Sequence, residues 1–463
     1  MSRFSSYIPY YKRNLKLAIP IVFSQIGQIM VHLFDNIMVG HLGTTELAAA
    51  SFAGSIFIIG MIFGMGFCLG LTPLAGAAYG AGEQKRVSAL FQNSLLLNGL
   101  LSIGITLIMY SLIYWMDKMG QPEEVVQLSI PYYLLLVPSM IPVMLFSSIK
   151  QFGEGLGNTK TAMYITLSGN VLDIILNYGL IYGKLGLPEM GVQGAAFSTL
   201  ITRILVALSF GYLCLKQEPF KQYVRLFHWA AVQTETLRDL FRTGFPISLQ
   251  ILSEVSAFSL TTIMAGWIGK TSIAAHQIAL SMSSITFMMA MGVASATTVR
   301  VAHQFGAFRF HDLRKAAFAS IHLVLSFMGL SGIFLLSFRQ FIPYLFTSDP
   351  EVIRLASTLL IAAGIFQIFD GLQLIMVSAL RGMSDVKAPL YISVISYLLV
   401  CLPLAYLFGF ILRMETPGIW IGISLGLVIA GSLFYFRFLK LNRMILFEYK
   451  NQKKQARHNA DIA

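Results

Sequence analysis

Charged side chains are scarce in this chain of 463 residues. Only 12% of the residues are Asp, Glu, Lys or Arg, whereas soluble domains carry about 25%, and 56% of the residues are hydrophobic. This composition excludes an ordinary soluble protein. Apolar runs of roughly 20 residues, each long enough to cross a bilayer, recur along the whole chain. The sequence therefore predicts an all-α polytopic membrane protein with hardly any domain outside the membrane.

Features typical of a metal protein, an ATPase or a cleaved leader are also missing. Cys68, Cys214 and Cys401 are far apart in apolar segments, so we expect small core residues and no disulfide framework or metal site. No GxxxxGK[ST] loop is present, so the chain cannot energise transport with nucleotide on its own. His276 has no second His or Cys at metal-ligand spacing, which favours a packed or hydrogen-bonded histidine. The N-terminus lacks a small-residue cleavage site, so we expect the first helix to be retained.

Twelve membrane-spanning helices are predicted from the apolar runs, with ends accurate to roughly four residues. They lie at about 15–38, 46–72, 88–115, 127–150, 161–182, 192–215, 238–267, 272–300, 315–338, 352–380, 389–412 and 418–439. An even number of spans places both termini on one side of the membrane. The loops on that side carry most of the basic residues, among them Arg3, Lys85, Lys150, Lys160, Lys216 and the solvated tail from Arg437 onward. Both termini are therefore predicted to be cytoplasmic, and the net charge of +12 does not indicate nucleic-acid binding.

The two halves of the chain repeat each other at an offset of 226 residues, which is the distance from Pro20 to Pro246 (246 − 20 = 226). Pro20 is echoed by Pro246, and the turn Gly40–Gly43 is echoed by Gly266–Gly269. An offset held over this length argues for duplication of a six-helix unit. Six spans per half give the two units the same orientation, so we predict parallel repeats.

We expect two six-helix lobes, residues 1–225 and residues 226–463, the second ending in the short basic tail. The linker is predicted at 216–236, and the Gly-rich segment 153–158 is interpreted as a tight cytoplasmic turn. Two similar bundles can rock against each other and open a midplane cavity to either side in turn, which is transporter architecture. The alternative is a static scaffold that arose by duplication, but a scaffold would not need buried acids.

The first span carries polar side chains three and four residues apart, which places them on one helix face. These side chains are Gln25, Gln28, His32 and Asp35. A carboxylate at membrane depth costs at least about 2.5 kcal/mol. Asp35 is therefore expected to face a protein interior where an ion, a proton or a substrate is handled. The alternative is that Asp35 lies at the helix end and reaches the headgroups.

A second polar stripe follows the fifth span. It consists of Thr166, Asn170, Asp173 and Asn177. Together with Asp35, this stripe supplies carboxylate and amide oxygens, the ligands that a hard cation such as Na⁺ prefers. Thr199 could add a hydroxyl group. Asn170 and Asn177 could instead form only interhelical hydrogen bonds.

The second half carries its own acids within the spans. Gln250 and Glu254 lie one turn apart on the seventh span, and Gln367, Asp370 and Gln373 follow the tenth. Burial favours the uncharged form of a carboxyl group, so these acids could bind and release a proton near neutral pH as readily as they bind sodium. Acids outnumber bases within the spans. With abundant Phe, Met and Tyr, such a cavity should favour lipophilic cations.

Several segments closely resemble the multidrug and toxic compound extrusion (MATE) family, in its NorM-like branch, over nearly the whole chain. The matching segments are Asp35–Gly43, Gly194–Ala196, Ala274–Ser281 and Val299–Val301, together with Glu254 and Asp370. The resemblance implies a secondary antiporter that exports cationic drugs or dyes by alternating access against inward Na⁺ or H⁺ flow. It implies no enzyme activity, no cofactor and a bacterial cytoplasmic membrane, and we expect a monomer.

By the same resemblance, Asp35, Asp173, Asn177 and Thr199 look like a first-lobe cation site, and Glu254 and Asp370 look like second-lobe acids. Na⁺ could bind at either group. The candidates for a substrate cavity are Gln25, Gln28, His32, Gln250, Gln277, Phe366 and Gln367. The chain departs from the family at three positions. Relatives often have Asn where this chain has Asp173, a Tyr where it has Phe366, and a Pro where it has Ala290.

Two other functions are weighed against this interpretation. A lipid-linked oligosaccharide flippase of a related fold would favour a basic cavity for pyrophosphate, whereas these spans are acidic. A membrane-embedded enzyme would need catalytic acids or histidines clustered in one half, whereas the acids here are spread over both.

Overall fold

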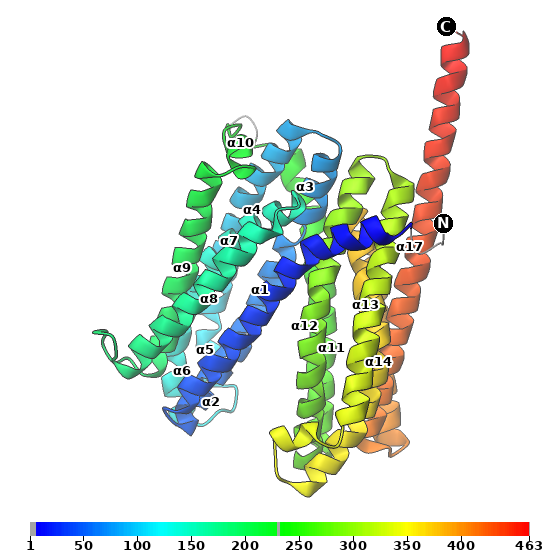
Figure 1. Ribbon diagram of the computed structural model, residues 1–463. Coiled ribbons are helices and arrows are strands. Elements are labelled where there is room, and N and C mark those ends of the chain that lie inside the picture. The colour runs from blue at the N-terminus through cyan, green and yellow to red at the C-terminus, as the bar shows by residue number, and fades with distance from the viewer. Residues whose placement is uncertain (1–5, 229–231, 463) are drawn as a thin grey trace. The chain divides into compact units, whose positions relative to one another are not determined.

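The computed structural model describes residues 6–228 and 232–462, and only the backbone of residues 452–462. Regular secondary structure in these residues is helical throughout (Figure 1). Twelve helical segments of the described chain are long and apolar enough to cross a membrane, which confirms the predicted fold class. Arg3 and residues 229–231 of the predicted linker lie outside the described residues.

The chain forms two compact units. Ile19–Leu252 form one, which we call the middle unit, and the residues up to Ala18 with those from Ser253 onward form the other, which we call the flanking unit. Helices α1 (Ile8–Gly40) and α11 (Thr234–Ile268) each contribute to both units. These two helices begin 234 − 8 = 226 residues apart, the offset of the sequence repeat. The predicted lobe boundary at residue 225 stays a prediction.

The middle unit also contains the helices from α2 to α10. They are α2 (Thr44–Cys68), α3 (Leu71–Gly80), α4 (Gln84–Ser111), α5 (Ile113–Met116), α6 (Glu123–Leu136), η1 (Val137–Ser139), α7 (Met140–Gly155), α8 (Thr159–Tyr182), α9 (Val192–Lys216) and α10 (Phe220–Val224). The fourth span is interrupted where Pro138 lies in the 3₁₀ turn η1, because proline cannot donate a backbone hydrogen bond. Phe91 stacks on Phe152 with ring centres 4.0 Å apart and forms part of the core.

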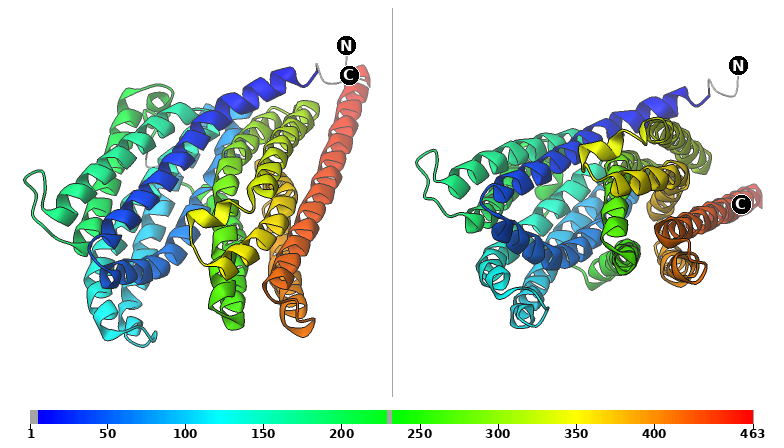
Figure 2. Two further views of the ribbon diagram at one scale, coloured as in Figure 1. Left: turned by 60° about the horizontal axis from the view of Figure 1, so that its bottom comes forward. Right: turned by 90° about the horizontal axis from the view of Figure 1, so that it is seen from below.

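The flanking unit contains the remaining helices. They are α12 (Lys270–Gly306), α13 (Phe310–Phe338), η3 (Ile342–Leu345), α14 (Pro350–Gly382), α15 (Lys387–Ser393), η4 (Val394–Cys401), α16 (Leu402–Tyr406), η5 (Leu407–Ile411) and α17 (Glu415–Ile462). Helix α17 packs against α14 and α13 (Figures 1 and 2). Its Trp420, Phe434 and Phe438 are fully buried there. Segments η4 and η5 are π-helical turns on either side of Pro403.

Small residues let helices of the flanking unit approach closely. A Cβ atom added at Gly332 of α13 would lie 2.5 Å from the carbonyl oxygen of Gly364 on α14. Such contacts are the usual means of close helix packing in membranes, where small residues allow backbones to meet. On the same helix, Gly329 has open space around it.

The structure corrects two details of the sequence interpretation. Gly153 belongs to helix α7, which continues to Gly155, so the predicted cytoplasmic turn begins only at Leu156. Lys150, assigned to a loop, lies in the same helix and is 9% exposed. The helices also extend beyond the predicted spans, because polar residues continue a helix past its apolar run; the first begins at Ile8.

Candidate functional site

Asp35 and Asn177 meet in the middle unit. The Nδ2 atom of Asn177 donates a 2.6 Å hydrogen bond to Oδ1 of Asp35, which joins α1 to α8. Asn177 is fully buried and Asp35 is half-buried. The structure therefore brings one residue from each of the two predicted polar stripes into contact.

Asp173 lies one turn before Asn177 and is 6% exposed. Its Oδ2 atom lies 3.5 Å from Nδ2 of Asn177, so one amide group contacts both carboxylates. On α9, the hydroxyl of Ser198 donates to Oδ1 of Asp173 at 3.3 Å and to its backbone carbonyl at 3.2 Å. The predicted hydroxyl ligand, Thr199, makes no hydrogen bond to either acid within the described residues. Ser198 was missed because the resemblance indicated the next residue, Thr199, as the hydroxyl ligand.

Arg203 is a basic residue on α9, the helix that also carries Ser198. Its Nη1 atom donates to Oγ of Ser139 at 2.6 Å, and its guanidinium lies 5.2 Å from the ring centre of Phe57. Its charge acts on Asp173 and Asp35, although no direct ion pair joins them in the described part of the chain. Two carboxylates and one guanidinium leave a single negative charge when all are ionised, and this cluster can attract a cation.

The flanking unit holds a second acid cluster around Glu254 of α11. Its Oε1 atom accepts hydrogen bonds from Nε2 of Gln373 at 2.9 Å and from the hydroxyl of Tyr397 at 3.3 Å. These partners come from α14 and from the π-helical turn η4. Gln373 belongs to the polar stripe predicted on the tenth span. Tyr397 had no sequence signal, because it is one of three tyrosines in a largely apolar span and no spacing in the sequence distinguishes it from the other two.

Asp370 lies three residues before Gln373 on α14 and is 5% exposed. Because residues three apart share a helix face, Asp370 lies on the face of α14 from which Gln373 donates to Glu254. Gln367, one turn earlier, is 1% exposed, and neither atom of its amide has a hydrogen-bond partner among the described residues. An unpaired buried polar group costs about 1–3 kcal/mol. The amide of Gln367 could therefore form hydrogen bonds to a polar ligand.

The residues predicted to line a substrate cavity lie in varied surroundings. Gln25, Gln250 and Phe366 are buried, and the Phe366 ring lies 5.6 Å from that of Trp420. The exposed ones are His32 and Gln277. Gln28 is half-buried. Whether these side chains contact a substrate stays a prediction.

His276 is a packed histidine, as its sequence context predicted. It is fully buried, accepts a 3.0 Å hydrogen bond at Nδ1 from Nε1 of Trp420, and pairs through Nε2 with the hydroxyl of Thr262 at 3.2 Å. No group of three or more His, Cys, Asp or Glu side chains that could hold a metal ion occurs in the described residues. The three cysteines are free and buried, as expected.

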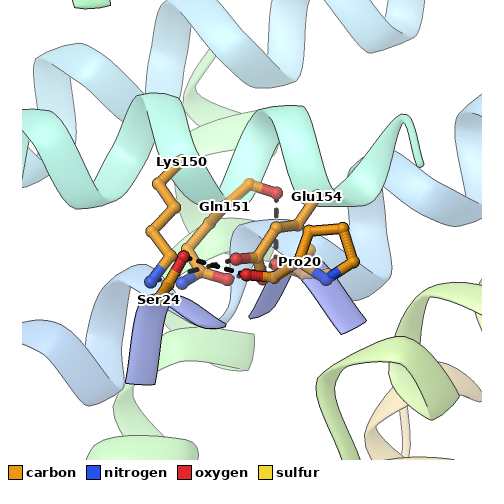
Figure 3. A network of polar contacts seen from close by, with 6 residues as sticks. Pro20, Ser24, Lys150, Gln151 and Glu154 are labelled. Atoms are coloured by element: carbon orange, nitrogen blue, oxygen red, sulfur yellow. Dashed lines mark hydrogen bonds and ion pairs between the residues drawn. The ribbon is translucent and has the colours of Figure 1, made fainter. Parts of the chain in front are cut away.

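A third polar cluster, near the end of α7, was missed by the sequence analysis. Lys150 Nζ lies 3.9 Å from Oε1 of Glu154, and these side chains are only 11% and 3% exposed (Figure 3). The next residue after Lys150, Gln151, contacts α3. The hydroxyl of Thr72 donates to Oε1 of Gln151 at 2.7 Å and to the backbone carbonyl of Gln151 at 3.2 Å. Figure 3 also draws Ser24 of α1, whose hydroxyl donates to the carbonyl of Pro20. The signal that could have found this cluster is the i, i+4 spacing of Lys150 and Glu154.

Known proteins resemble the chain over almost its full length. The MatE family model matches residues 20–179 and 246–407, well over half of the chain. A relative from Rhizobium meliloti (strain 1021), called probable multidrug resistance protein NorM, is 33% identical; the match covers 95% of this chain and 96% of the relative. A relative from Photobacterium profundum, called multidrug resistance protein NorM, is 31% identical over 92% of this chain and 94% of its own.

Solved structures support the same fold. The structure of a mutant of the Vibrio cholerae MATE transporter VcmN gives a TM-score of 0.88 at 20% identity and covers 95% of this chain and 98% of that chain. The structure of a MATE protein in the bent conformation gives a TM-score of 0.87 at 23% identity, with 95% and 97% covered. At this level of identity the likeness establishes the architecture alone.

Proposed function

This chain belongs to the MatE family, and from that membership we propose that it is a multidrug efflux transporter that exports lipophilic cations in exchange for Na⁺ or H⁺. The observation that carries the proposal is the pair of acid clusters. One is built around Asp35 and Asp173, and the other around Glu254 and Asp370. Each cluster lies on helices that are apolar enough to span a bilayer, where carboxylates are costly and therefore rare outside functional sites.

Exchange follows from the chemistry of these clusters. A buried carboxylate needs a positive partner, which a proton, a sodium ion or a cationic drug can supply. Asp35, Asp173, Asn177 and Thr199, or Glu254 with Asp370, are the candidate coupling groups. When one cation replaces another at such a group, inward flow of the coupling ion can drive outward movement of the drug.

The remaining features of the proposal concern the cell. The protein lies in the cytoplasmic membrane of a bacterium with both termini in the cytoplasm, as the basic loops indicate. Its two lobes of six spans, 1–225 and 226–463, would open to either side in turn, and the chain would act as a monomer.

Dye extrusion tests the proposal. The chain is expressed in an efflux-deficient bacterium, and the loss of an ethidium-type dye from loaded cells is followed by fluorescence. We expect Asp35→Asn and Asp370→Asn each to abolish extrusion at unchanged protein level. The matched controls are Glu123→Gln and Glu351→Gln, which neutralise exposed acids of the middle and the flanking unit and should leave extrusion intact. Full activity in both Asp variants would refute the site assignment.

Proteoliposomes identify the coupling ion. Purified protein is reconstituted with dye inside, and sodium and proton gradients are imposed separately. Extrusion driven by only one gradient identifies that ion. Extrusion that neither gradient stimulates would refute antiport.

A further inference from the structure

A cavity of about 330 Å³ lies between α13 and α17 in the flanking unit. Three basic side chains line it, Arg314 of α13 and Arg443 and Lys450 of α17. No acidic residue is among its lining residues, and none of the three cations forms an ion pair within the described part of the chain. We call this cavity the basic pocket. Arg314 also lies over the ring of Phe318 at 5.4 Å, and no lining acid offsets the positive charge of the pocket, which can therefore attract an anion.

The rest of the lining is apolar apart from one amide. Leu439, Leu446 and Phe447 supply the apolar wall. Asn442 is 2% exposed, and its Oδ1 atom has no hydrogen-bond partner among the described residues. Rotation of the amide by half a turn exchanges its oxygen and NH₂ group, so Asn442 can offer an acceptor or a donor to a guest.

The basic pocket lies at one end of the spans. The long apolar run of α13 starts after Lys315, and that of α17 ends at Arg437, after which basic residues recur. Both helices therefore pass from hydrocarbon to the headgroup layer at the height of the pocket. Phe310 and Tyr449, whose rings lie 5.3 Å apart, hold the start of α13 against α17 and keep the pocket walls together.

This combination of groups selects a ligand class. A guanidinium fork matches a phosphate oxygen pair, and the ammonium of Lys450 adds a further charge. A soluble phosphate compound has no apolar group that could contact the apolar wall. A phospholipid has acyl chains, which can lie along Phe447, a side chain that is 65% exposed. We propose that the basic pocket binds the phosphate of an anionic phospholipid such as phosphatidylglycerol. This binding does not depend on the proposed transport function.

Native mass spectrometry of the purified full-length chain tests the proposal. The protein is mixed with phosphatidylglycerol or phosphatidylcholine in detergent, and the retained lipid is counted. The wild type should retain phosphatidylglycerol preferentially. Each basic residue near an anionic headgroup raises the affinity for the lipid about fivefold. The triple variant R314Q/R443Q/K450Q should therefore lower the preference for phosphatidylglycerol by roughly 100-fold.

The matched control is the triple variant R354Q/R413Q/K270Q. It removes the same three charges from exposed positions of the flanking unit outside the pocket, and it should keep the preference of the wild type. Equal losses in the two triple variants would overturn the proposal, because net charge alone would then explain the binding. If the triple pocket variant does not fold, R443Q alone should still show a drop of about fivefold.

Soluble competitors distinguish the two possible sources of phosphate. Inorganic phosphate and glycerol 3-phosphate at millimolar concentration should leave phosphatidylglycerol bound to the wild type. If either compound displaced the lipid, the pocket would be a site for soluble phosphate and the lipid assignment would be wrong.

Discussion

The buried pair of Lys150 and Glu154 allows a sharp test of how charge stabilises the middle unit. The perturbation is Glu154→Gln, which keeps the shape of the side chain and removes its charge. Removing one partner of a buried ion pair leaves the other charge uncompensated, which costs about 3–5 kcal/mol. The 3.9 Å separation and the 11% exposure of the Lys150 side chain weaken this pair, so we expect a loss somewhat below that range, about 2–3 kcal/mol.

Thermal unfolding of the purified protein in detergent measures this loss. For a unit of this size, each kcal/mol shifts Tm by about 2–4 °C, so Glu154→Gln should lower Tm by roughly 4–12 °C. The matched control is Glu83→Gln, which removes the same charge from the exposed pair Arg86–Glu83 at the N-terminal end of α4, where the side chains are 61% and 48% exposed. Exposed pairs contribute little, and this control should not change Tm measurably.

The double variant K150M/E154M separates charge from packing. Apolar side chains of similar volume in place of a buried ion pair are usually neutral or stabilising, so the double variant should recover the Tm of the wild type. Equal Tm values for Glu154→Gln and the wild type would refute the reasoning, since the pair would then carry no buried charge. If the double variant were as unstable as Glu154→Gln, the loss of Tm would come from altered packing and not from an uncompensated charge.

Two further predictions concern close packing and the first acid cluster. Gly332→Ala should lower stability by about 1–3 kcal/mol in thermal unfolding, because the new Cβ forces α13 away from a carbonyl of α14, whereas Gly329→Ala on the same helix should have no such effect. Asn177→Leu should reduce dye extrusion by about tenfold or more, because Asp35 loses a charge-assisted hydrogen bond, while Asn170→Leu on the same helix should retain most activity. Equal effects within either pair would contradict the corresponding explanation.

Much of the architecture could be predicted from the sequence, because a bilayer imposes one length on every span and requires helical backbone. The repeat of 226 residues also survives in the structure, since α1 and α11 start that far apart. The helix ends were less predictable. The segment at Gly153 was interpreted as a loop because it is rich in glycine, yet packing inside a bundle keeps it helical.

The acid clusters were predictable only in part. The spacing along single helices indicated Asp35 and Asn177, because residues three or four apart share a face. Neighbouring residues such as Ser198 and Thr199 point about 100° apart on a helix, so the choice between them depends on how the helix is rotated in the bundle. Tyr397 contacts Glu254 across 143 residues, and no local pattern in the sequence carries such a contact.

The π-helical turn η4 has a consequence for engineering of this protein. A π turn holds one residue more than an α-helical turn, so deletion of a single residue between 394 and 397 would let the helix relax to the narrower form. Each residue of an α-helix accounts for about 100° of rotation, and such a deletion would change the direction in which Tyr397 points while the span stays intact. The extra residue thus sets the phase of the eleventh span, and a shortened chain could insert and fold normally yet leave Glu254 without its tyrosine.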